Sequence, residues 1–183
     1  MADIVEKVED YVTSSKISTR LLMDKLSEFL AVERGGIKLY QAALQIVQDR
    51  EVSQKFREFF EQTKKHEAIL TRVIRELGGD PDHVSPGAAM AEKKAKSLLE
   101  TMTNSDGLNG RAAELNAIEN IVIAETKDHA DWEMIGKIAR RSDNEKIRNV
   151  LKPAAREVEP EEDEHLNWTK EQMARLEFEM LSQ

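Results

Sequence analysis

The sequence predicts an all-α protein built as a single bundle of long helices. Apolar residues recur every three or four positions along most of the chain, which is the spacing of helices with one buried face. The composition agrees, since 8 glycines, 4 prolines, 5% aromatic and 34% charged residues are typical of helices with solvated outer faces. A length of 183 residues fits one domain over residues 1–183.

Charge and cysteine content narrow the classes of partner and cofactor. A net charge of −8 offers no general basic surface for nucleic acid or for an anionic membrane. The chain has no cysteine, which excludes disulfides, zinc ribbons and thiolate-bound iron, so a metal site would need Glu, Asp and His ligands. The N-terminus lacks the apolar core of a signal peptide or membrane anchor, and we expect a cytoplasmic protein.

The first half of the chain predicts a helical hairpin. Residues 1–18 form an N-terminal extension with a short amphipathic helix near 3–13, and a long helix follows over about 19–48 with Glu33 within its apolar stripe. The pair Gly35-Gly36 would weaken this helix by roughly 1 kcal/mol each relative to Ala, so we expect another backbone to approach closely there. The second long helix, about 53–77, places Thr63 and His66 on its inward face and stops at Gly78-Gly79.

A long connection separates this hairpin from a second one. Residues 80–110 contain a loop, a shorter helix that begins near Ser85-Pro86, and a turn-rich stretch around Asn104–Gly107. A hairpin, a long crossover and a second hairpin is the topology of ferritin-like bundles rather than of a simple up-and-down bundle.

The second hairpin again carries ionisable residues on its inward faces. The third long helix, about 111–140, has a stripe that includes Glu125 and His129. The fourth, about 144–181, has Glu162 and His165 on its stripe. Pro153 and Pro160 lie inside the fourth helix, where each removes a helical hydrogen bond, and we expect them to bend it.

Six ionisable residues near the middle of the four long helices form the candidate metal site. Burying carboxylates and imidazoles on apolar stripes is costly unless they are compensated by hydrogen bonds, opposite charges or a metal ion. Each residue has a simpler interpretation by itself, such as a hydrogen-bonded core histidine, but their occurrence on all four stripes favours a shared site. The predicted ligands are Glu33, His66, Glu125, His129, Glu162 and His165.

The segments LAVER (30–34), EQTKKH (61–66) and EEDEH (161–165) resemble those of the ferritin-like superfamily, in particular small rubrerythrin-like or stress-related bacterial proteins. Such di-metal bundles take one Glu from each of two helices and a Glu-x-x-His pair from each of the other two. The resemblance implies that Glu33 and Glu125 are the single glutamates and that Glu162 and His165 form one pair. The other pair departs from the pattern, because Thr63 stands where its glutamate should be. We expect His129 to replace the missing ligand, ahead of Glu61 or Glu67.

The resemblance implies a non-haem centre with two iron ions, or alternatively manganese or zinc, and a ferroxidase-like or peroxidase-like role in iron or oxidative-stress handling. Dioxygen or peroxide would be the co-substrate, and a peroxidase without cysteine would need an external electron donor. Two alternatives stay open, a metal-free bundle that serves as a scaffold or stress protein, and a cage-forming iron store. The catalytic residues and the oligomeric state are left open by the sequence, with a homodimer among the options.

Overall fold

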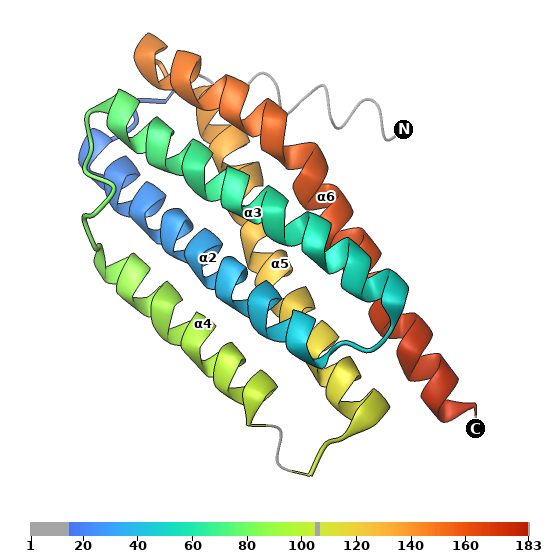
Figure 1. The fold of residues 1–183 in the computed structure, drawn as a ribbon. Coiled ribbons are helices and arrows are strands. Elements are labelled where there is room, and N and C mark those ends of the chain that lie inside the picture. Colours follow the sequence, from blue (N-terminus) through green and yellow to red (C-terminus); the bar gives the residue numbers. More distant parts are fainter. Residues whose placement is uncertain (1–14, 105–106, 183) are drawn as a thin grey trace, which may run out of the picture.

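The computed structural model describes residues 15–104 and 107–182, and its regular elements there are all helices, which confirms the predicted all-α class. The bounds lie within about three residues of the helices predicted from the sequence. The helix predicted near 3–13 lies outside the described residues. In chain order the helices are α2 (Thr19–Ile46), α3 (Arg50–Leu77), α4 (Pro86–Thr103), α5 (Gly110–Arg141) and α6 (Glu145–Leu181) (Figure 1).

Local polar groups determine where several helices begin and end. The Asp49 side chain accepts hydrogen bonds from the first-turn N–H groups of α3, and Asn144 does the same for α6. Ser85 caps α4, directly before Pro86 at its first position. Helix α3 ends at Gly78, whose φ of 91° is the left-handed conformation that terminates many helices.

Viewed along the bundle, the long helices α2 and α6 lie diagonally opposite each other. Helix α2 packs against α3 and α5, and α6 packs against the same two helices. Helix α4 lies outside this group, against α2 and α5, and carries the chain back from the end of α3 to the start of α5 (Figure 1). The crossover predicted over residues 80–110 is therefore built largely of α4, and each neighbouring pair of long helices is antiparallel.

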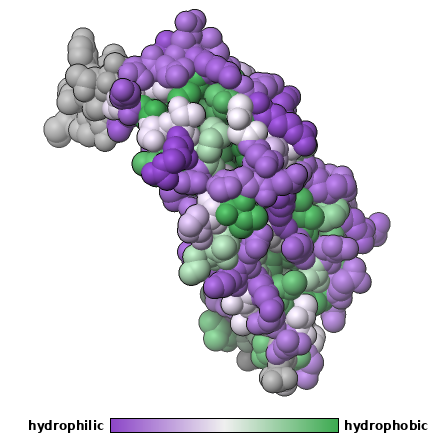
Figure 2. Space-filling model, turned by 90° about the vertical axis from the view of Figure 1, so that its left-hand side faces the viewer, coloured by the Kyte–Doolittle hydropathy of each residue, from purple (hydrophilic) through white to green (hydrophobic). Residues whose placement is uncertain are grey.

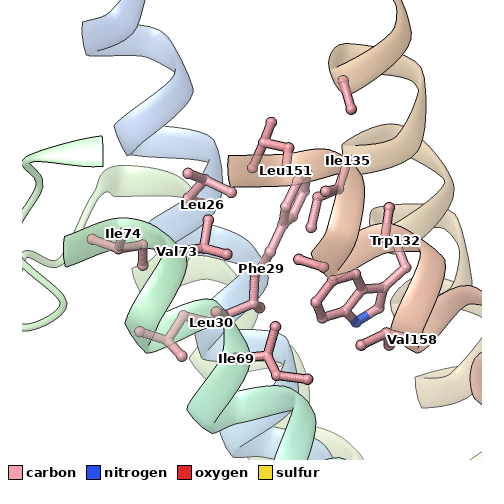
Figure 3. Packing of buried hydrophobic residues seen from close by; sticks show 14 of the residues in the cluster. Leu26, Phe29, Leu30, Ile69, Val73, Ile74, Trp132, Ile135, Leu151 and Val158 are labelled. Atoms are coloured by element: carbon pink, nitrogen blue, oxygen red, sulfur yellow. The ribbon is translucent and has the colours of Figure 1, made fainter. Parts of the chain in front are cut away.

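The buried apolar side chains form two main clusters, one toward each end of the bundle. The first cluster surrounds Phe29, Leu151 and Trp132, and Figure 3 shows side chains from α2, α3, α5 and α6 converging there. The second surrounds Tyr40, Phe56 and Phe59. All four long helices contribute to both clusters, so the segment between the clusters lies at the middle of every long helix.

The glycine pair in α2 lies where two other helices come close, as the sequence predicted. A Cβ atom built on Gly35 would lie 2.7 Å from the Cβ atom of Ala95 in α4. A Cβ atom on Gly36 would lie 3.3 Å from Cγ2 of Thr63 in α3. The missing side chains thus allow α4 and α3 to pack closely against α2.

Helix α6 runs through both of its prolines without a break and curves along its length (Figure 1). Figure 2 shows the face on the α4 side of the molecule, where hydrophobic residues reach the surface in separate patches between hydrophilic ones. Among the described helices, none combines the length and the apolar character needed to cross a bilayer.

The contact at Gly35 gives a test of the fold. We expect Gly35→Ala to lower the free energy of unfolding, because overpacking against Ala95 costs about 1–3 kcal/mol and outweighs the gain of up to about 1 kcal/mol in helix propensity. The double variant Gly35→Ala/Ala95→Gly removes the clash and should recover most of the loss. Urea unfolding monitored by circular dichroism measures both. A Gly35→Ala chain more stable than wild type would contradict this packing.

Candidate metal centre

A layer of buried ionisable side chains lies between the two apolar clusters. Its members come from the middle of each long helix, and their exposed fractions are at most 4%. The layer comprises Glu33 from α2, His66 from α3, Glu125 and Asp128 from α5, and Glu162 and His165 from α6. Five of these six were predicted from the sequence.

The layer contains two groups of three side chains that could each hold a metal ion. Glu33, His66 and Glu162 form one group, and Glu125, Glu162 and His165 form the other, with the ligand atoms of each group within 4.8 Å of one another. Glu162 belongs to both groups. Its Oε1 atom faces Nδ1 of both histidines, so the two groups are neighbours.

The His66 ring is oriented by a partner outside the layer. Its Nε2 atom lies 2.7 Å from a carboxylate oxygen of Glu161, which also pairs with Lys65. A hydrogen bond from Nε2–H to this carboxylate leaves the lone pair on Nδ1, which faces the layer 2.8 Å from Oε1 of Glu162 and 3.9 Å from Oε1 of Glu33. A carboxylate that accepts the second N–H of a ligating histidine is a common feature of metal sites.

The His165 ring is held in a matching way by an amide. Its Nε2 atom lies 2.8 Å from Oε1 of Gln62, which can only accept, so Nε2 carries the proton. Its Nδ1 atom faces Oε2 of Glu125 at 3.4 Å and Oε1 of Glu162 at 3.6 Å. Both imidazoles therefore turn Nδ1 toward the layer, and a neutral ring with its proton on Nε2 is the form that binds metal through Nδ1.

Buried polar atoms without a hydrogen-bond partner are concentrated at this layer. Among the described residues they include Nδ1 of His165 and Oε2 of Glu162, together with one oxygen each of Glu33, Glu125 and Asp128. Nδ1 of His66 and Oε1 of Glu162 lie 2.8 Å apart but without the geometry of a hydrogen bond. Unsatisfied buried polar atoms are rare in folded proteins and call for an explanation such as an ion. The other oxygen of Glu33 accepts a hydrogen bond from the indole N–H of Trp132 at 2.7 Å.

Burial changes the proton affinity of these groups. Loss of hydration raises the pKa of Glu33, Asp128 and Glu162 well above the ordinary carboxyl range, and the neighbouring carboxylates raise it further. Burial lowers the pKa of His66 to about 4, although its hydrogen bond to Glu161 acts in the opposite direction. His66 is therefore neutral near pH 7, whereas these three carboxyl groups resist ionisation unless a positive charge joins them.

Thr63 occupies the position of the glutamate that the ferritin-like pattern requires. It is buried, and its hydroxyl donates to the backbone oxygen of Phe59 one turn earlier at 2.9 Å. Its methyl group faces Gly36. Thr63 therefore contributes to the packing of α3 against α2 and supplies no carboxylate to the layer.

His129 is not brought to the layer, contrary to the expectation that it would replace the missing ligand. It is partly exposed, and its Nε2 atom lies 2.7 Å from a carboxylate oxygen of Asp163 at the surface between α5 and α6. The prediction placed His129 on the inward stripe with Glu125, but the buried residues of α5 there are Ile121 and Asp128, and Asp128 lies one residue before His129. That difference in phase turns His129 away from the other helices.

Asp128 is the member of the layer that the sequence analysis missed. It follows Glu125 by three residues, the spacing of a Glu-x-x-His pair, and it is 4% exposed. After loss of hydration, the Asp128 carboxyl is the next largest cause of the raised pKa of Glu33. Apolar residues at Ile121 and Ile135, one heptad on each side, were the signal for this phase.

The chain matches no family model, no curated protein and no solved structure among those compared with it. The geometry of the buried layer is therefore what points to a metal centre.

The raised carboxyl pKa values predict how the metal-free chain responds to pH. Carboxyls of the unfolded chain ionise near pH 4, while Glu33, Asp128 and Glu162 keep their protons to higher pH in the folded chain. Unfolding then releases protons, so the free energy of unfolding should fall as pH rises through the raised values. The lowered pKa of His66 opposes this only below about 6.5, so the decrease should be clearest above that pH.

Urea unfolding in the presence of a chelator between pH 6.5 and 8.5 measures this dependence. Glu162→Gln removes one titrating group and should reduce the slope by up to about 1.4 kcal/mol per pH unit. Glu171→Gln, an exposed change on the same helix, serves as the control and should leave the slope unchanged. A wild-type stability that is flat or rises over this range would show that the buried carboxyls ionise without cost.

Proposed function

We propose that the chain is a ferritin-like, non-haem metalloprotein that binds two metal ions in the buried layer, and that it acts in iron or oxidant handling. Iron is the metal that we propose, with manganese or zinc as alternatives. The proposed reaction is that of a ferroxidase-like or peroxidase-like oxidoreductase. The observation that carries the proposal is the membership of Glu162 in both three-residue groups.

The donor set fits two ions of this kind. Two imidazole nitrogens and several carboxylate oxygens suit divalent metals of intermediate hardness such as iron, manganese and zinc. The layer contains four carboxyl groups, on Glu33, Glu125, Asp128 and Glu162, so their full ionisation would balance the four positive charges of two divalent ions. Metal binding would thereby remove the repulsion that raises the carboxyl pKa values and satisfy the orphaned atoms.

The chain's own residues would orient the ligands and keep water away. Glu33 and His66 would hold one ion and Glu125 and His165 the other, with Glu162 between them and Asp128 as a further carboxylate near Glu33. Gln62 and Glu161 fix the two imidazole rings, and Trp132 holds Glu33. Two irons would supply redox chemistry toward dioxygen or peroxide. Since the chain has no cysteine, we propose that electrons for a peroxidase reaction come from a separate donor.

Thr63 supports the alternative function, a bundle that no longer binds metal and serves as a scaffold or stress protein. A bridging carboxylate is absent at this position, and the space is filled by packing. If this alternative holds, the layer is the remainder of a former metal site and lowers the free energy of unfolding of the chain. The two proposals predict opposite effects of removing Glu162.

Elemental analysis of the purified chain, before and after reconstitution with Fe²⁺ or Mn²⁺ without oxygen, tests the metalloprotein proposal. We expect two ions per chain and a higher melting temperature with metal, because a ligand that binds only the folded chain stabilises it. Glu162→Ala should lose at least one ion and most of this gain, while Glu171→Gln keeps both. A wild-type chain that binds neither metal, with a Glu162→Ala variant as stable or more stable, supports the scaffold instead.

The partner of His165 provides a second test. Gln62→Leu should leave Nε2–H without an acceptor and lower metal affinity by about 10–100-fold. Gln62→Glu keeps an acceptor and should retain most of the affinity. Gln54→Leu makes the same change at an exposed position of α3 and is the control. Isothermal titration with Mn²⁺ compares the three, and equal affinities for Gln62→Leu and Gln54→Leu would exclude a role for Gln62.

A further inference from the structure

A polar pocket between α5 and α6 lies next to the buried layer. Its volume is about 140 Å³, and His129, Glu133 and Lys137 of α5 line it together with Glu159 and Asp163 of α6. A single water needs roughly 10–15 Å³ of such space, so the pocket has room for a cation with several waters.

The pocket reaches the candidate centre through Glu162, which also lines it. Glu162 is 1% exposed, and neither of its carboxylate oxygens has a hydrogen-bond partner among the described residues. An ion in the pocket would therefore lie next to the residue shared by both three-residue groups, whose carboxylate oxygens are themselves buried. His66, by contrast, is covered on its outer side by Glu161 and Lys65.

The charges around the pocket favour a cation. Outside the layer, three of the lining residues are acidic, Glu133, Glu159 and Asp163, against two basic residues, Lys137 and Arg140. One of the basic residues, Lys137, is paired with Glu133 at 3.2 Å. A cleft with an excess of one sign raises the local concentration of the opposite ion and its rate of association.

The backbone of α5 makes room for one of these acids. Gly136 faces Glu159, and a Cβ atom at this position would overlap the Glu159 carboxylate. The absence of a side chain at residue 136 therefore lets Glu159 fold over α5 and line the pocket.

We propose that this pocket is the route by which divalent cations reach the buried layer, and that the partly exposed His129–Asp163 pair is the first site that binds them on this route. His129 and Asp163 are partly exposed, with side-chain exposed fractions of 25% and 63%. Nε2 of His129 and one carboxylate oxygen of Asp163 are hydrogen-bonded to each other at 2.7 Å, so the second nitrogen of the ring and the second oxygen of the carboxylate would be the ligands of a cation that is losing its water. The inference rests on the proposed function, and it assigns His129 a role in delivery rather than in the centre.

The rate of Co²⁺ uptake by the metal-free chain tests the route, because bound Co²⁺ is seen by its visible absorbance. His129→Asn/Asp163→Asn should slow uptake by about tenfold, since it removes the first cation-binding site of the route and one negative charge. Lys137→Gln/Arg140→Gln should accelerate uptake several-fold by removing both positive charges. The amount of Co²⁺ bound at equilibrium should stay at two ions per chain in both variants.

The chain offers a matched control on another face. His83 lies 3.1 Å from Asp24 as a similar surface pair of α2 and the loop before α4, so His83→Asn/Asp24→Asn removes the same chemical groups away from the pocket. Its uptake rate should equal that of wild type.

The results of these uptake measurements distinguish a failure of the proposed route from a failure of the proposed function. Wild-type rates in both pocket variants, with two ions bound, would overturn the route and leave the metal centre intact. A smaller amount bound by His129→Asn/Asp163→Asn would make His129 a ligand and overturn its role in delivery. A wild-type chain that binds no Co²⁺ at equilibrium would overturn the proposed function and the route together.

Discussion

Four carboxyl groups and two imidazoles buried in one layer form the constraint on which the rest of the structure depends. Loss of hydration disfavours the charged forms of Glu33, Asp128, Glu162 and His66, and neighbouring carboxyls disfavour ionisation of the three acids further. The apolar clusters on either side provide the burial that holds the four helices together despite this cost. A positive charge at the middle of the bundle would offset both of these costs.

The surroundings of the layer determine how its ligands can act. Side chains that are not in the layer, Gln62, Glu161 and Trp132, hold both histidines and Glu33 with one bond each. Their bonds leave the candidate ligand atoms of the layer facing one another. A site whose ligands are already oriented requires little rearrangement on binding, which favours affinity.

The two sides of the layer differ in their access to solvent. On the α3 side the Lys65–Glu161 pair covers His66, and close packing at Gly36 brings α2 and α3 together. On the α5–α6 side the polar pocket ends at Glu162. Glu162 thus belongs to both candidate sites and also lines the pocket.

The sequence by itself determined the all-α class, the bounds of the described helices and five of the six members of the layer. It could do so because helical periodicity and caps are local signals, and because an ionisable residue on an apolar stripe stands out. The tertiary structure decided between His129 and Asp128. Those two residues lie about 100° apart around α5. Leu115 and Val122 have the helical spacing that would turn His129 inward, whereas Ile121 and Ile135 have the spacing that turns Asp128 inward. Only the packing of α5 against α2 and α6 buries one of them, since burial depends on the neighbouring helices.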